Sequence, residues 1–116
     1  MRHLSKLVLA CAVGAGCATA VPQAKIDGAQ KAISSASDAV GTQSGVAAER
    51  LADAKKEFDS AQELIKGGKT DEALRTLAKS DADAKLAQAL GVEGKARADL
   101  ASVMDQIKAL KAQLGK

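Results

Sequence analysis

The side chains that carry out most enzyme chemistry are scarce in this 116-residue chain. The one histidine is His3, the two cysteines are Cys11 and Cys17, and there is no Trp or Tyr. General acid–base catalysis, nucleophilic triads and zinc sites depend largely on these residue types. We therefore expect no catalytic residues, no metal site and no cofactor, and a protein that is not an enzyme.

The charged residues also indicate no ligand class. Asp81 and Asp83 lie two residues apart, so on a helix they would point to different faces and form no carboxylate metal site. Seventeen basic and fourteen acidic residues alternate along the chain, without a basic block. This pattern predicts no nucleic-acid binding.

The first seventeen residues have the pattern of a secretion signal that ends at a cysteine. Arg2 and Lys6 precede an apolar run at 7–13, which is too short to span a bilayer, and small residues at 14–16 lead to Cys17. This order resembles a bacterial lipobox, in which the signal is cut before a cysteine that becomes lipidated. The resemblance implies a lipoprotein signal peptide at 1–16 and a short tether at 17–22 that begins with the lipidated Cys17.

Two alternatives to lipidation at Cys17 stay open. Cys11 also follows apolar and small residues, although cleavage there would leave almost no apolar run after Lys6. Ordinary secretion without a lipid is the other alternative, because Gly14 stands where the lipobox usually has Leu. Ala18 follows the cysteine where an Asp would commonly signal inner-membrane retention. The resemblance therefore favours the periplasmic face of the outer membrane, with a membrane contact through the acyl anchor.

Apolar spacing predicts two helices after this segment. We expect the first over about 23–40, with Pro22 well suited to be its first helical residue. We expect the second from Val46 to about Lys66, after a loop at 41–45. Both have an apolar stripe with the alternating three- and four-residue steps of a coiled-coil face. The stripes are Ile26, Ala29, Ile33, Ala36 and Val40 in the first helix, and Ala47, Leu51, Ala54, Phe58, Ala61 and Ile65 in the second.

A glycine pair should join the second helix to a third. Gly67-Gly68 can supply the left-handed C-terminal cap, Thr70 can cap the next helix, and Asp71 can pair with Arg75. The apolar face of the third helix is wide, which predicts contact with two helices at once. It comprises Ala73, Leu74, Leu77, Ala78, Ala82, Ala84, Leu86, Ala87, Ala89 and Leu90.

The predicted fold is therefore all-α. We expect an antiparallel three-helix bundle, or helical hairpin, over 23–90, with a long C-terminal helix and a preceding signal peptide. The abundance of alanine and the single aromatic ring, Phe58, predict a thin seam between closely packed helices.

Residues 91–116 are expected to extend the third helix as a heptad segment. Gly91 and Gly94 would cost about 2 kcal/mol together relative to alanine, yet the heptad register continues across them. A continuous helix is favoured, and a break with a short fourth helix that folds back is the alternative. If the helix is continuous, five residues form a possible interaction seam with another copy or an envelope protein: Leu100, Val103, Ile107, Leu110 and Leu114.

The hairpin resembles a known group of proteins. Leu51-Ala52-Asp53-Ala54, Phe58, the turn at 67–73 and the segment at 81–87 are similar to a helical domain of unknown function in bacterial envelope lipoproteins. That domain stands alone or ahead of an OmpA-like domain, and the resemblance covers about residues 23–90. Thr70 departs from the aromatic residue usual in the family's turn. No OmpA-like domain follows, so the resemblance does not imply peptidoglycan binding.

A weaker similarity concerns the murein lipoproteins. Ala24-Lys25-Ile26-Asp27 is similar to their mature N-terminal region, and their C-terminal lysine is joined to peptidoglycan, which would be Lys116 here. An ordinary polar chain end is the favoured explanation for Lys116. The functional hypothesis is thus a non-catalytic outer-membrane lipoprotein that serves as a helical spacer or protein-interaction module. The alternative is a tether joined to peptidoglycan through Lys116.

Overall fold

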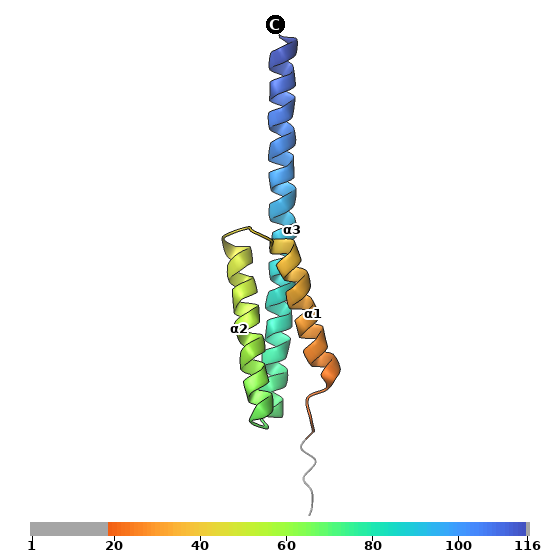
Figure 1. Cartoon of the computed structure of the whole chain (residues 1–116), viewed down its shortest axis with the longest axis vertical. Coiled ribbons are helices and arrows are strands. Elements are labelled where there is room, and N and C mark those ends of the chain that lie inside the picture. Colours follow the sequence, from red (N-terminus) through yellow and green to blue (C-terminus); the bar gives the residue numbers. More distant parts are fainter. Residues whose placement is uncertain (1–18, 116) are drawn as a thin grey trace, which may run out of the picture.

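The computed structural model describes residues 19–115, which form three helices. These are α1 (Gln23–Val40), α2 (Val46–Lys66) and α3 (Thr70–Leu114). α1 and α2 lie beside the first half of α3, and the second half projects beyond them as a single helix (Figure 1). The predicted all-α bundle with a long C-terminal helix is confirmed. The signal segment, Cys17 and Lys116 lie outside the described residues.

The core is a narrow seam built largely from alanine. α2 buries side chains at the predicted spacing of four and three residues: Ala47, Leu51, Ala54, Phe58 and Ala61. α1 buries Ala29, Ala32, Ile33, Ala36 and Val40, and the predicted Ile26 is only half-buried at the edge of this cluster. Small side chains allow the helix axes to approach closely, so burial is obtained without a deep interior.

α3 is the central helix and packs against both of the others, as its wide apolar face predicted (Figure 1). Its buried face consists of Ala73, Leu77, Ser80, Ala84, Ala87 and Gly91. Four residues expected on the apolar face are instead exposed: Ala78, Ala82, Leu86 and Ala89. Alanine occurs all around this helix, so apolar spacing alone does not define the side that the neighbours cover.

Ser80 is a core residue that the apolar pattern did not indicate. Its side chain is fully buried, and its hydroxyl Oγ donates a 2.7 Å hydrogen bond to the carbonyl oxygen of Ala54 on α2. Such a bond satisfies a polar group that would otherwise be costly to bury. It also fixes the position of α2 along the axis of α3.

The turn between α2 and α3 is a Schellman motif. The Lys69 amide donates to the Leu64 carbonyl at 2.9 Å, and the Gly68 amide donates to the Ile65 carbonyl at 3.0 Å. This arrangement requires a left-handed residue, and Gly68 supplies it with φ of 72°. The predicted glycine cap is therefore confirmed for Gly68, whereas Gly67 has φ of −79°.

The predicted bounds of α1, 23–40, match the structure, but the roles predicted for Pro22 and Thr70 at the helix starts are wrong by one position. Pro22 has ψ of 131°, which is extended, so it precedes the helix, which begins at Gln23. Thr70 is already helical and Lys69 occupies the cap position, without a side-chain hydrogen bond. A threonine inside the first turn no longer places its oxygen near the free amides that an N-cap satisfies.

α3 continues without interruption through Gly91 and Gly94, so the favoured prediction is confirmed and the folded-back fourth helix is wrong. The last turn of α1 passes directly over Gly91. A Cβ atom there would lie 2.7 Å from the carbonyl carbon and oxygen of Ala39. Gln43 reinforces the contact, since its Nε2 donates to the carbonyls of Ala39 at 3.1 Å and Gly91 at 2.9 Å. Gly91 provides room for α1 and Gly94 provides room for the Gln43 side chain, and neither glycine marks a break.

Candidate interaction surface

The part of α3 beyond the bundle, residues 95–114, is here named the α3 extension. At 1.5 Å per residue it is about 30 Å long. All its residues are exposed, including the five predicted for an interaction seam. Their exposed fractions are 60% for Leu100, 49% for Val103, 46% for Ile107, 57% for Leu110 and 87% for Leu114. The structure therefore places these five side chains on an unpartnered helix.

The five residues belong to a longer line along α3, here named the outer seam: Leu86, Ala89, Ala96, Leu100, Val103, Ile107, Leu110 and Leu114. At 3.6 residues per turn, its part beyond residue 95 lies about 140° around α3 from the stripe that faces α1 and α2. All eight residues are exposed. The outer seam thus points away from the bundle core.

The polar residues of this region pair mainly with one another. Arg97 Nη2 lies 2.6 Å from Glu93 Oε1, and Lys95 Nζ lies 3.2 Å from Asp99 Oδ2. Each such pair on an exposed helix surface contributes a few tenths of a kcal/mol. These pairs help to keep the extension helical. The apolar line, in contrast, contacts no other part of the described chain.

Met104 also belongs to this surface, although it is not among the five predicted seam residues. It adjoins Val103 in the chain and is 50% exposed. An apolar residue directly after a d position of a heptad widens a coiled-coil face, and that spacing is the signal that indicates it.

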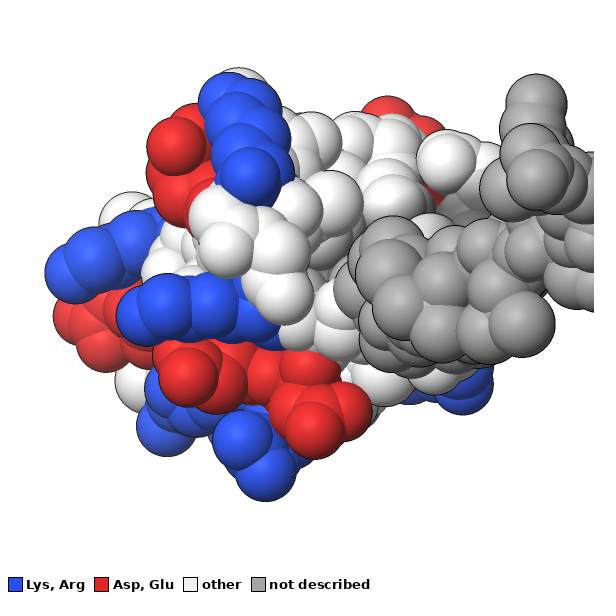
Figure 2. All heavy atoms as spheres, turned by 90° about the horizontal axis from the view of Figure 1, so that it is seen from below, with Lys and Arg blue, Asp and Glu red and all other residues white. Residues whose placement is uncertain are grey.

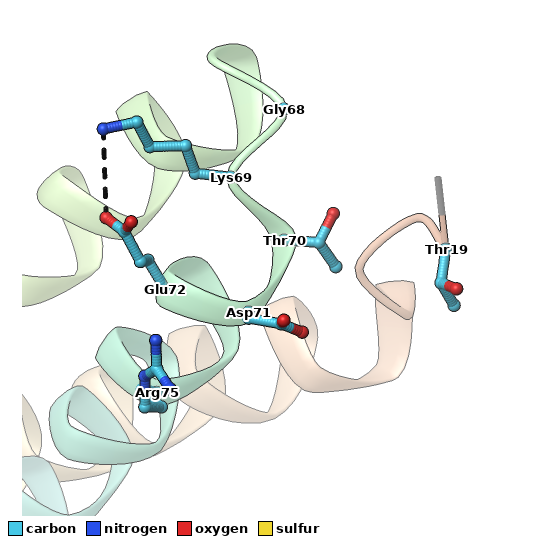
Figure 3. Close-up of a pocket in the computed structure, with 7 residues that line it drawn as sticks. All are labelled: Thr19, Gly68, Lys69, Thr70, Asp71, Glu72 and Arg75. Atoms are coloured by element: carbon cyan, nitrogen blue, oxygen red, sulfur yellow. Dashed lines mark ion pairs between the residues drawn. The ribbon is translucent and has the colours of Figure 1, made fainter. Parts of the chain in front are cut away.

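A surface hollow lies at the opposite end of the molecule from the α3 extension, beside the α2–α3 turn. It has a volume of about 520 Å³, and Thr19, Lys69 and Arg75 are among the residues that line it (Figure 3). Lys69 pairs with Glu72 at 3.9 Å. The expected pair of Asp71 with Arg75 is not formed, because the Asp71 carboxylate points away from the guanidinium (Figure 3).

Charges of both signs surround this end of the bundle. Seen from below, Lys and Arg side chains lie next to Asp and Glu side chains (Figure 2). Lys66 Nζ, for example, lies 2.7 Å from Glu63 Oε1. Such a mixed surface selects neither an anion nor a cation, so the hollow indicates no ligand class.

Ion pairs also connect α2 to α3 along one side of the bundle. Arg50 Nη1 lies 3.6 Å from Asp83 Oδ1, and Lys79 pairs with Glu57, whose side chain is mostly buried. The hydrogen bond and negative charge of Glu57 raise the pKa of Lys79. Because each cation faces an anion of the other helix, these groups position α2 against α3.

The two aspartates considered for a metal site pair with cations of different helices. Asp81 Oδ2 accepts a 2.7 Å bond from Lys85 in its own helix, whereas Asp83 faces Arg50 of α2. Within residues 19–115, no three or more His, Cys, Asp or Glu side chains gather as a metal site would require. Likewise, no helix in this range is both long and apolar enough to cross a membrane.

Comparisons with protein families, curated proteins and solved structures find no match to this chain. The five residues of the predicted interaction seam lie on one exposed stretch of helix, the α3 extension. The predicted lipidation site, Cys17, and the predicted attachment site, Lys116, lie outside the residues that the structure describes.

Proposed function

We propose that this chain is a non-catalytic lipoprotein of the bacterial outer membrane that faces the periplasm and serves as a helical spacer and protein-interaction module. The observation that carries the proposal is the exposed apolar line on the α3 extension, in a chain whose first residues resemble a lipoprotein signal. An apolar line of this length on a lone helix is typical of a surface that binds another helix.

The positions of the two ends of the described chain, residues 19 and 115, support a role as a spacer. Thr19 lies beside the α2–α3 turn, at the end of α3 opposite to Leu114 (Figure 1). α3 has 45 residues and is therefore about 67 Å long. An acyl anchor on Cys17 would hold the bundle near the membrane and direct the α3 extension away from it. Each buried CH₂ of such an anchor adds about 0.8 kcal/mol of membrane affinity.

Lipidation of Cys17 tests the membrane part of this proposal. The full chain is produced in a Gram-negative host with radiolabelled palmitate, and the variants Cys17→Ser and Cys11→Ser are compared. We expect label and outer-membrane fractionation in the wild type and in Cys11→Ser, and loss of both in Cys17→Ser. Label that persists in Cys17→Ser, or a wild-type chain without label, would contradict the proposal.

A second candidate function is a tether joined to peptidoglycan through Lys116. The α3 extension favours it, because the C-terminal end of α3 lies far from α1 and α2 (Figure 1). Mass spectrometry of muropeptides after protease digestion distinguishes the two functions. A Leu-Gly-Lys remnant on the wall that disappears in Lys116→Ala indicates a tether, and its absence from the wild type leaves the spacer.

A further inference from the structure

The outer seam faces away from α1 and α2, so another long helix can lie along it without meeting them. The seam continues below the extension to Leu86 and Ala89, which are exposed beside the bundle. We propose that the outer seam pairs with the outer seam of a second copy of this chain, in parallel and in register. This deepens the interaction role proposed above by naming the partner, and it rests on that role but not on the lipid anchor.

The spacing of the outer seam is the heptad spacing of a coiled coil. Leu100, Ile107 and Leu114 occupy a positions, and Ala96, Val103 and Leu110 occupy d positions. From Leu86 to Leu114 the line spans about four heptads, and one charged residue, Glu93, occupies the a position between Ala89 and Ala96. A strict seven-residue repeat drifts slowly around a straight helix, and supercoiling with a partner of the same repeat corrects that drift.

Side-chain size favours a partner with the same order of residues. Along the outer seam, alanines at 89 and 96 lie next to the bundle, and the larger residues follow toward Leu114. Parallel, in-register pairing places alanine against alanine and leucine against leucine, so every layer has matched size. Antiparallel pairing would place Ala96 against Leu114 and leave the layers uneven.

The charged residues beside the outer seam favour the same orientation. Arg97 and Lys111 occupy e positions, and in a parallel pair they face the preceding g residues of the second copy, Val92 and Gln106. No like charges meet at these e and g positions. Glu93, at an a position, would meet its own copy, but its carboxylate is paired with Arg97 of the same helix at 2.6 Å. An antiparallel pair would place Arg97 of each copy beside Lys111 of the other, which is repulsive at both ends of the pair. Size and charge therefore select the same parallel pair.

Cysteine cross-linking of the full chain tests this inference. The variant Ala96→Cys places the thiol on the outer seam, and Ala98→Cys places it about 200° further around the helix. Both replace an exposed alanine, so both should keep the helical circular dichroism of the wild type. The purified full chains are oxidised in detergent, and the wild type controls for Cys11 and Cys17. We expect a disulfide-linked dimer for Ala96→Cys and only the wild-type background for Ala98→Cys.

The same experiment determines the orientation. In an antiparallel pair, the two copies of residue 96 would be about 27 Å apart, beyond the reach of a disulfide. A mixture of Ala96→Cys and Leu114→Cys would then cross-link while neither variant cross-linked alone. That result would overturn the parallel arrangement. Equal dimer in Ala96→Cys and Ala98→Cys, or none in either, would overturn the pairing itself.

Sedimentation equilibrium of the full chain in detergent gives a second readout. We expect the wild type to have the mass of two chains and Ile107→Asp the mass of one. The matched control Ala109→Asp adds the same charge on the opposite face and should keep two chains. A wild-type mass of one or three chains, or a different protein bound along the seam, would refute the inference. Loss of palmitate label with an intact dimer would instead refute only the lipid anchor.

Discussion

Replacement of Gly91 by alanine should destabilise the bundle, although helix propensity alone predicts the opposite. In an isolated helix, alanine is more favourable than glycine by about 1 kcal/mol. Here the new Cβ would lie 2.7 Å from the carbonyl carbon and oxygen of Ala39 and 2.8 Å from the amide nitrogen of Val40. These are backbone atoms, so no rotamer change removes the overlap and the last turn of α1 has to move.

The size of the effect follows from what that movement disturbs. Overpacking of a closely packed site costs about 1–3 kcal/mol. Movement of α1 also weakens the hydrogen bonds of Gln43 to Ala39 and Gly91, which together contribute about 1 kcal/mol or more. After the gain of about 1 kcal/mol in helix propensity is subtracted, we expect Gly91→Ala to lower the free energy of unfolding by about 1–3 kcal/mol.

Urea denaturation followed by circular dichroism measures this change at one fixed chain concentration. Two other glycines serve as matched controls. A Cβ at Gly28 meets open space, so Gly28→Ala should stabilise by up to about 1 kcal/mol. A Cβ at Gly94 meets only the end of the Gln43 side chain, so Gly94→Ala should have an intermediate effect. If Gly91→Ala were as stable as Gly28→Ala, the close approach of α1 to α3 would be refuted.

Two further predictions concern the turn and an interhelical ion pair. Gly68→Ala should lower the midpoint of urea unfolding and cost about 1–2 kcal/mol of stability, because an L residue is strained at φ of 72°. The control Gly67→Ala should cost much less, and equal effects of the two variants would contradict the Schellman geometry. The pKa of Lys79 in the folded chain is raised, mainly by its hydrogen bond to Glu57. The stabilisation from this lysine is therefore complete below the pKa of an unfolded lysine, about 10.4, and is lost as the pH rises through the higher pKa of the folded state. The melting temperature of the wild type should therefore fall more steeply above that pH than that of Lys79→Gln, and parallel profiles would contradict this.

The sequence was sufficient to predict α1 and α2 because their signals agree at every level. Gly41 and Gly45 bound the loop, Gly67-Gly68 ends α2, and the stripe from Ala47 to Ala61 has one consistent period. For these helices the local preference and the tertiary contacts select the same face. The bounds of both helices and most of the core therefore followed from spacing alone.

The face of α3 was harder to predict for a physical reason. The residues that contact α1 and α2 include Ser80 and Gly91, which apolar spacing omits, while Leu86 and Ala89 on the other side are apolar and exposed. Close helix packing selects small residues irrespective of polarity, and alanine is common on every side of this helix. The spacing placed the seam residues on one line, but the direction of that line relative to the bundle required the structure.

The unbroken course of α3 through Gly91 and Gly94 ties the bundle and the outer seam to one rigid frame. Because a helix couples advance to rotation, a change in the length of α3 alters both at once. Insertion of seven residues after Gly94 would move the seam outward by about 10.5 Å and leave its direction nearly unchanged. Insertion of two residues would turn it by about 200°, toward the side of α1 and α2. The seam therefore keeps its direction only when the length of α3 changes by close to a whole number of helical turns, as with seven or eleven residues.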